Sequence, residues 1–307
     1  ILPKLNGILK IVKKYILEWS KTVMLSRTHG QPASPTFLGK EFLVFYERLV
    51  IQARKLTNIK YTTKFGGAVG NFNAHIMALP NIDWVEFADK FIVKFGIERN
   101  QYTTQIDHYD NYSEIFDILR RINIILIDMS RDMWSYISRD YFKLRMTDDQ
   151  VGSSAMPHKN NPIYFEKAEA NLLLSNAMWN LFSNTLPISR MQRDLRDSSL
   201  LRNLGTGFSY MLISLKSIES GLNKLDINKK ILEDDLEKNH LVILEGIVGR
   251  LKLVDNLNTY DLFKNVSRID DSKNEIEKII SNLDIDDDEK KYIKTCKPNT
   301  YTGLYKL

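Results

Sequence analysis

Hydrophobic residues recur along most of the chain at intervals of three and four, the spacing that gathers them on one face of an α-helix. The clearest run covers residues 113–139 and contains no glycine or proline. Its hydrophobic positions are Ile115, Ile118, Ile122, Ile125, Met129, Met133 and Ile137. At 1.5 Å per residue this helix would be roughly 40 Å long, longer than a small domain is wide. The pattern therefore predicts a bundle of unusually long helices.

Other segments follow the same period, and strand-like alternation of polar and apolar residues is nearly absent. The further helical segments are 1–21, a run that starts near residue 36, 162–184 and 198–222. The predicted fold class is therefore all-α, with long helices forming the core.

The sequence pattern changes after residue 222, where the helical segments become shorter and polar cap or turn residues separate them. We predict a long-helix domain over residues 1–222, with its start truncated, and a smaller all-helical domain over residues 223–307. The acidic run at 284–289 lacks the central glycine and the terminal glutamate spacing of a calcium loop. A solvated turn with charges at a helix start is the better interpretation.

Composition and charge narrow the possible classes of protein. The 307 residues are 43% hydrophobic and 26% charged, which excludes a disordered, collagen-like or disulfide-rich chain. Lys and Arg number 43 against 38 Asp and Glu, a net charge of +5. This excess is too small for a nucleic-acid-binding protein, but it suits an anionic small substrate.

The single cysteine, Cys296, cannot form an internal disulfide, and nothing in its use points to an oxidising compartment. No apolar run approaches the roughly 18 to 20 residues that cross a bilayer, and no leader is recognisable, so we expect a cytoplasmic protein. The five histidines lack the spacing of a zinc site, so no metal is expected. The chain begins with Ile1 inside an amphipathic pattern, which indicates that the native N-terminus is missing.

Four polar segments interrupt the helices. In the first, residues 26–35, two prolines and a glycine exclude a continuous helix, so His29 lies on a constrained connection. A loop histidine between Thr28 and Gln31 is a candidate acid or base, because imidazole exchanges protons near neutral pH. A capping role for this histidine is the alternative.

The second segment, residues 64–75, is rich in glycine. Its glycines follow the order G-G-x-x-G, no strand precedes them and no Lys-Ser/Thr pair follows. A nucleotide phosphate loop is therefore a poor interpretation. Close approach of backbones between long helices explains the glycines better.

The third and fourth segments concentrate groups that bind anions. Residues 151–162 form a loop of hydroxyls, amides and one ammonium between Gly152 and Pro162. Such a set can surround a carboxylate and supply a basic oxygen that a nearby cation activates. Residues 189–202 contain four arginines, whose planar forks suit phosphate or carboxylate groups. Asp194 and Asp197 suggest that some of them form orienting ion pairs, and a solvated charged face is the alternative.

The third segment also carries a resemblance. Residues 152–162 read Gly-Ser-Ser-x-Met-Pro-x-Lys-x-Asn-Pro, which resembles the signature loop of the fumarase/aspartase superfamily. Fumarases and aspartases usually have Gly before the lysine and argininosuccinate lyases usually have Gln, whereas His158 in that place is similar to the adenylosuccinate lyase family. Residues 27–32, 102–106 and 193–202 agree with that family.

This resemblance implies a homotetramer whose core is a bundle of long helices from every subunit, with active sites assembled from segments of three subunits. It implies β-elimination of fumarate from two substrates of purine nucleotide biosynthesis. Adenylosuccinate gives AMP, and succinyl-carboxamide imidazole ribotide (SAICAR) gives its carboxamide product (AICAR). Neither reaction needs a metal or an organic cofactor. The resemblance also leads us to expect that the N-terminal domain of the family and the start of its central domain lie outside this sequence.

The resemblance also implies roles for single residues. Ser153 matches the catalytic base, which needs help from a cation such as Lys159 because a free serine is a very weak base. His29 matches the general acid that protonates the departing nitrogen. The implied substrate-binding residues are Thr28, Gln105, Lys159, Asn161, Arg193, Ser198 and Arg202. Supporting roles fall to Ser154 and to Glu166, a carboxylate thought to orient the histidine machinery.

Two positions depart from the family and three alternatives stay open. Lys167 stands where many relatives carry an asparagine, and Asn160 replaces a residue that is often apolar or basic. Another lyase of the superfamily is the nearest alternative, but its substrates lack the phosphate that the arginine segment suits. Joint retention of Ser153, His29 and Lys159 argues against a non-catalytic scaffold. The small charge excess argues against a helical nucleic-acid-binding protein.

Overall fold

The computed structural model describes residues 1–145, 160–255, 262–263, 266 and 272–306. The chain divides into two compact units, and neither is contiguous in sequence. Unit 1 comprises Ile1–Ile11, Phe45–Ser135 and Met146–Lys224, and unit 2 comprises Val12–Val44, Tyr136–Arg145 and Leu225–Leu307. The domain boundary expected after residue 222 stays a prediction.

Long helices dominate the fold, as the periodicity predicted. They are α1 (Leu2–Glu18), α2 (Leu38–Asn58), α5 (Asp110–Ser138), α6 (Ile163–Thr185) and α8 (Leu204–Asn223). The apolar stripe of α5 is buried at Ile118, Ile122, Ile125, Met129 and Met133. The all-helical fold class is therefore confirmed. Within the described residues, no helix is both long enough and apolar enough to cross a membrane.

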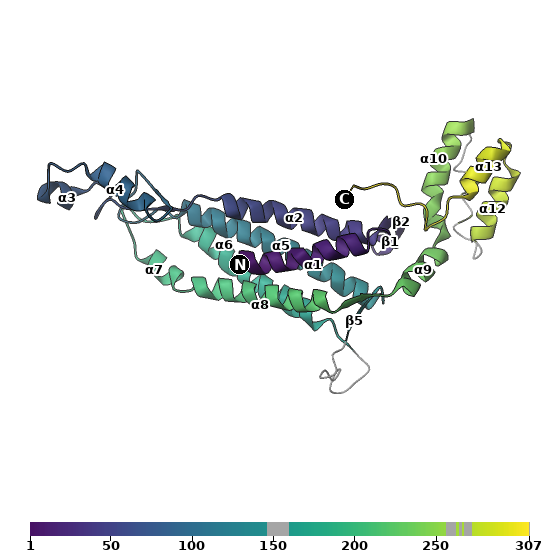
Figure 1. Ribbon diagram of the computed structural model, residues 1–307, viewed down its shortest axis with the longest axis horizontal. Coiled ribbons are helices and arrows are strands. Elements are labelled where there is room, and N and C mark those ends of the chain that lie inside the picture. Colours follow the sequence, from purple (N-terminus) through teal and green to yellow (C-terminus); the bar gives the residue numbers. More distant parts are fainter. Residues whose placement is uncertain (146–159, 256–261, 264–265, 267–271, 307) are drawn as a thin grey trace. The chain divides into compact units, whose positions relative to one another are not determined.

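In unit 1, α6 and α8 run side by side (Figure 1). The Phe116 ring of α5 stacks on the fully buried Trp179 of α6, with 5.3 Å between ring centroids. Gly207 of α8 makes this packing possible, because a Cβ atom there would lie 2.8 Å from the Trp179 indole. Ser175 links the same helices by donating to the Gly207 carbonyl at 3.0 Å.

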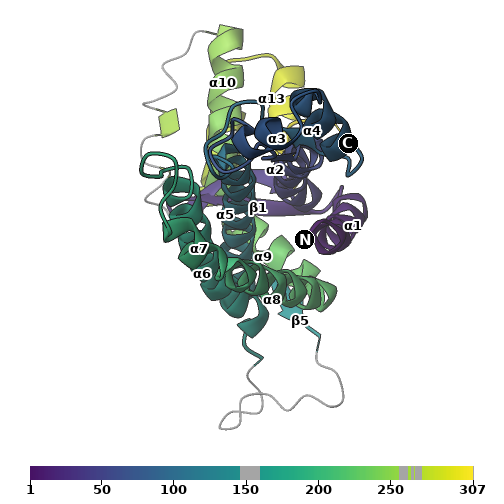
Figure 2. The same cartoon turned by 90° about the vertical axis from the view of Figure 1, so that its left-hand side faces the viewer.

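Short elements complete unit 1: β3 (Thr62–Thr63), α3 (Asn73–Ala78), α4 (Trp84–Val93), β4 (Glu98–Arg99) and α7 (Arg196–Leu201). Strands β3 and β4 pair in parallel. Helices α3, α4 and α7 lie toward the same end of the unit (Figures 1 and 2). The single helix expected over 198–222 is instead two helices, because the chain breaks at Arg202 and Asn203 before α8 begins.

Unit 2 contains two antiparallel strand pairs and the short helices of the C-terminal part. The strands are β1 (Val23–Thr28) with β2 (Gln31–Phe37), and β5 (Phe142–Leu144) with β6 (Leu225–Ile227). The helices are α9 (Lys229–Lys238), the 3-10 helix η1 (His240–Ile243), α10 (Leu244–Asp255), α12 (Ser272–Asn282) and α13 (Asp287–Lys294).

Two apolar clusters hold unit 2. Tyr15 stacks on Trp19 with ring centroids 4.1 Å apart, and Phe42 and Phe142 pack against Trp19. The second cluster joins α10, α12 and α13 through buried residues that include Ile247, Leu251, Ile276, Ile280 and Ile293. The acidic run at 284–289 supplies the N-cap of α13, because Asp286 accepts a bond from the Asp288 amide.

Candidate functional site

His29 occupies the tip of the β1–β2 hairpin in unit 2. Its φ of 53° and the φ of 76° at Gly30 are both positive, as the central residues of a type I′ hairpin turn require. The side chains of His29 and of the neighbouring Thr28 are exposed. The constrained connection expected from the two prolines is therefore a tight strand reversal that presents the imidazole to its surroundings.

A polar cluster next to this turn anchors the hairpin to α9. Arg27 donates from Nη2 to both carboxylate oxygens of Asp235, at 2.8 and 2.6 Å. Tyr141 donates its hydroxyl to the same carboxylate, and Asn239 donates to Asp235 Oδ1 at 3.2 Å. Burial, together with the bond to Asp235, raises the pKa of Tyr141 to about 12. Sequence reasoning missed this anchor, because Asp235 lies in an ordinary charged helix.

In unit 1 the glycine-rich segment approaches the backbone of residues 102–105. Gly70 has a φ of 86°, and a Cβ atom there would lie 2.0 Å from the Thr103 carbonyl oxygen. Lys64 donates to the Gln105 carbonyl at 2.5 Å and also to the Gly67 carbonyl. Burial lowers the pKa of Lys64. The glycines do allow a close backbone approach, but the expectation that it lies between long helices is wrong, because Gly70 meets Thr103 and both residues lie in irregular segments.

Gln105 lies in contact with the arginine-rich segment. Its backbone amide donates to the Gln192 carbonyl at 3.2 Å. Its side-chain Oε1 accepts a bond from Arg193 Nη1 at 3.3 Å. Two residues that the family resemblance named separately, Gln105 and Arg193, therefore meet in unit 1.

The four arginines of residues 189–202 divide into two kinds. Asp194 pairs with Arg190 at 3.1 Å and with Arg196 at 3.9 Å, and it also accepts the Arg196 backbone amide at 3.0 Å. Arg193 and Arg202 are exposed and pair with no carboxylate of the described residues. The ion pairs expected in this segment therefore form at Asp194, whereas Asp197 pairs with no arginine of the described residues. Arg193 and Arg202 have no carboxylate partner there and are available to an anionic ligand.

Helix α7, which carries Ser198, is fastened through Asp197. This aspartate is buried and accepts the Tyr109 hydroxyl at 2.9 Å. Burial and this bond raise the pKa of Tyr109 well above its ordinary value. Tyr109 precedes α5 and has a φ of 59°, so a strained residue holds the contact. The sequence offered no signal for Tyr109.

Asn161 and Glu166 lie at the start of α6. Glu166 accepts the Trp134 indole N–H at 2.9 Å, and Glu169 one turn later pairs with Arg131 at 2.8 Å. Both bonds fasten the first turns of α6 to α5. The predicted residues Ser153, Ser154 and Lys159 lie outside the described residues.

The structure thus brings Gln105 and Arg193 together in unit 1, which also holds Asn161, Glu166, Ser198 and Arg202. His29 and Thr28 belong to unit 2. Over the described part of the chain, no group of three His, Cys, Asp or Glu side chains could hold a metal ion.

Two known protein families match this chain. Residues 1–178 match the family described as "Lyase", and residues 189–302 match "Adenylosuccinate lyase C-terminal". Adenylosuccinate lyase from Dictyostelium discoideum is 44% identical over 99% of this chain and 67% of its own length. The chain belongs to the adenylosuccinate lyase family.

Other relatives agree with this membership. Adenylosuccinate lyase from Legionella pneumophila (strain Corby) is 47% identical over 92% of the chain and 62% of its own length. The protein of the same name from Escherichia coli (strain K12) is 41% identical over 99% and 67%. The chain thus spans about two thirds of the length of the curated relatives it matches.

Two solved structures share the fold at low identity. A 3-carboxy-cis,cis-muconate lactonizing enzyme from Pseudomonas putida superposes with a TM-score of 0.78 at 17% identity, over 99% of this chain and 69% of its own. A class II fumarase from Schistosoma mansoni gives 0.69 at 17% identity, over 97% and 65%. At this identity the likeness concerns the fold alone.

Proposed function

We propose that the protein of which this chain forms part is a lyase that eliminates fumarate from adenylosuccinate to give AMP, and from SAICAR to give AICAR. Membership of the adenylosuccinate lyase family supports the reaction. A cytoplasmic location belongs to the same proposal, because purine nucleotide biosynthesis is its setting and the lone Cys296 gives no sign of an oxidising compartment.

The arginine segment carries the choice of substrate. Arg193 and Arg202 keep their guanidinium groups free of carboxylates in the described part of the chain, whereas Arg190 and Arg196 share Asp194. A phosphate group suits these two guanidinium groups, although Arg193 gives one N–H of Nη1 to Gln105, since a guanidinium can donate paired hydrogen bonds to phosphate oxygens. Argininosuccinate and malate have no phosphate, so the arrangement favours the two nucleotide substrates. Ser198, on α7 between the two arginines, would add a hydroxyl donor.

The chemistry needs a base and an acid on opposite sides of the bond that breaks. Ser153, as an alkoxide supported by Lys159, removes the proton from the carbon beside a succinyl carboxylate. The resulting doubly charged aci-carboxylate expels the amine as the C–N bond breaks, which leaves fumarate. His29 gives its proton to the departing nitrogen, so charge does not build up there.

The remaining residues would hold the succinyl part and the loop around it. Lys159 and Asn161 would bind the carboxylates, and Gln105 would bind the succinyl portion from its place beside Arg193. Thr28, next to His29, is proposed as a further contact, and Ser154 and Glu166 support the site. The elimination as written needs neither a metal nor an organic cofactor.

We propose a homotetramer with active sites shared between three subunits. Its support is the large apolar side chains that the long helices of unit 1 leave exposed, since the solvent-facing side of a helix is ordinarily polar. The exposed large hydrophobic residues on α5, α6 and α8 are Tyr112, Ile124, Trp134, Ile163, Leu173, Leu174, Leu181 and Ile213. A second copy of the chain would cover such a surface.

A turnover assay on the full-length protein tests the proposal. Adenylosuccinate, argininosuccinate and malate are offered in parallel. The formation of fumarate is followed in each case, by elimination from the first two and by dehydration of malate. We expect turnover of adenylosuccinate alone and its loss in Ser153→Ala, with the tetramer intact by light scattering. Turnover of another substrate would reject the nucleotide assignment. More than a few per cent of activity in Ser153→Ala would reject the base.

A further inference from the structure

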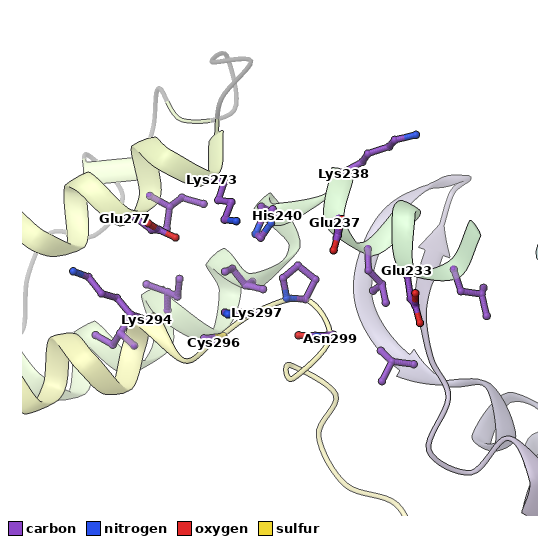
Figure 3. A pocket seen from close by; sticks show the side chains of 18 of the residues that line it. Glu233, Glu237, Lys238, His240, Lys273, Glu277, Lys294, Cys296, Lys297 and Asn299 are labelled. Atoms are coloured by element: carbon purple, nitrogen blue, oxygen red, sulfur yellow. The ribbon is translucent and has the colours of Figure 1, made fainter. Parts of the chain in front are cut away.

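Unit 2 contains a cavity of about 1070 Å³, slightly larger than the usual range of small-molecule sites (Figure 3). It is lined by α9, η1, α10, α12, α13, the start of β1 and the segment after α13. None of the residues proposed above for turnover is among its described lining residues. The cavity therefore calls for an explanation separate from the elimination reaction.

One wall of the cavity is apolar. It belongs to the buried core of the C-terminal part, so an apolar ligand surface would be shielded from water there. Its core side chains are Ile243, Ile247, Ile276, Ile280 and Ile293, and the other aliphatic residues of the lining are Val23, Leu232 and Leu236. An inorganic ion would leave this wall unused, whereas a molecule with an apolar or aromatic body would cover it.

The polar lining is rich in lysine. Six lysines line the cavity against three glutamates, Glu233, Glu237 and Glu277, a net charge of +3 with histidine neutral. The lysines are Lys21, Lys229, Lys238, Lys273, Lys294 and Lys297. All six lysine side chains are exposed, and their excess over the glutamates gives the lining a positive potential that attracts an anionic ligand.

Two of these lysines act on the same point of the cavity. Lys273 at the start of α12 and Lys297 after α13 both exert their charge on His240, against the opposing charges of Glu237 and Glu277. Burial, and then Lys273, lowers the pKa of His240, so its imidazole is neutral near pH 7 and can donate one hydrogen bond. Neither Lys273 nor Lys297 forms an ion pair with a carboxylate of the described residues.

The close-up view shows these groups together (Figure 3). Lys273 and Glu277 come from α12, Lys294 from α13, and His240 lies between them and Glu237 of α9, whereas Lys238 extends away from the rest. Lys294 donates to Ser281 Oγ at 2.9 Å, so its ammonium is partly engaged. The cations that we assign to a ligand are therefore Lys273 and Lys297, whose charges act on His240.

We propose that this cavity binds a small organic phosphate, with the phosphate held by Lys273, Lys297 and His240 and the organic body against the isoleucine-rich wall. Lysine ammonium groups bind phosphate as point charges, and a neutral imidazole N–H adds a directed bond. The site is additional to the proposed catalytic one, whose phosphate is assigned to Arg193 and Arg202 in unit 1.

Cys296 provides a local probe of this proposal. It lines the cavity, is partly buried and is the single cysteine of the 307 residues. Its reaction with a disulfide reagent is timed in the full-length protein and assigned to its peptide by mass spectrometry, so that any other thiol is not counted. The ligands are phenyl phosphate, inorganic phosphate and phenol. At ten times its dissociation constant, phenyl phosphate should slow the reaction about tenfold, since the unbound fraction alone reacts.

Charge-removing variants locate the phosphate. Lys273→Gln with Lys297→Gln should weaken the binding of phenyl phosphate by about 100-fold, about tenfold for each charge-assisted bond. The matched control, Lys10→Gln with Lys13→Gln, removes two exposed charges from α1 and should change nothing. If the first pair fails to fold by circular dichroism, each single variant carries the test, with about tenfold expected.

Arg193→Ala with Arg202→Ala separates this site from the catalytic one. Protection of Cys296 that persists in this variant supports the cavity, whatever becomes of turnover. Protection that disappears there and survives in the lysine variants overturns the proposal. Equal protection by inorganic phosphate and phenyl phosphate overturns the role of the apolar wall, and no protection by either overturns the site.

Discussion

The hairpin that carries His29 should depend on a single carboxylate of α9. Asp235 accepts two bonds from Arg27 and one from Tyr141, and the side chains of Asp235 and Arg27 are 19% and 20% exposed. Asp235→Asn keeps the shape of the side chain, removes its charge and turns a donor toward the Arg27 guanidinium.

The magnitude follows from the burial of the pair. A hydrogen bond to a charged group contributes about 1.5 to 3 kcal/mol, and removing one partner of a fully buried pair destabilises by about 3 to 5 kcal/mol. One-fifth exposure places this pair near the lower end, so the free energy of unfolding should fall by about 3 kcal/mol. At roughly 2 °C per kcal/mol for a chain of this size, the midpoint should fall by about 6 °C.

Thermal unfolding followed by circular dichroism measures the effect, and an equally short surface pair supplies the control. Arg48 and Asp128 also lie 2.6 Å apart, but their side chains are 39% and 49% exposed. Asp128→Asn should therefore change the free energy of unfolding by no more than about 0.5 kcal/mol. Equal shifts in Asp235→Asn and Asp128→Asn would refute the reasoning that burial gives the Asp235 bonds their strength.

Three further predictions concern single side chains. Arg193→Ala should raise KM for adenylosuccinate by about tenfold or more, because a charge-assisted bond is lost, whereas Arg190→Ala should change KM little. Similar KM values in the two variants would show that Arg193 does not bind the phosphate. The pKa of Tyr141 is raised from 10 to about 12, so the unfolded state binds fewer protons than the folded state between these pH values. The free energy of unfolding should therefore fall as the pH rises from 10 to 12. Tyr141→Phe should make this fall smaller when the free energy is measured by chemical denaturation across the same pH range. Gly70→Ala combines a positive φ with a steric clash and should lower the free energy of unfolding by about 2 kcal/mol or more. Gly96→Ala, where the φ is positive but the space is open, should lower it by about 1 kcal/mol. Equal losses of the two variants in urea titrations would exclude the clash.

The long helices were predictable because their cause is local. The stripe of α5 repeats at helical spacing over the whole run, and burial of Ile118 through Met133 follows from it. The hairpin was not predicted, because β1 and β2 are short and partly exposed, and β2 contains Pro32 and Pro35. A usable signal existed in His29-Gly30, a two-residue turn ending in glycine between flanking extended residues.

The sequence indicates an anion-binding segment by its residue types, but it does not indicate how these residues pair. Four arginines in fourteen residues indicate an anion, but the sequence does not say which of them Asp194 occupies. Arg190 lies four residues before Asp194 and Arg196 two residues after it, and the chain between them is not a regular helix. Helical spacing rules therefore do not apply, and the assignment needs the folded backbone.

The same arrangement recurs in both units, next to exposed side chains that we propose for the site. In unit 1, Asp194 bonds to the neighbours of Arg193 and leaves that guanidinium beside Gln105. In unit 2, Asp235 bonds to Arg27, two residues before His29, and the turn itself stays exposed. A carboxylate placed on the neighbour of a functional group fixes the backbone without neutralising the group. Pre-organisation of this kind lowers the ordering that substrate binding would otherwise require.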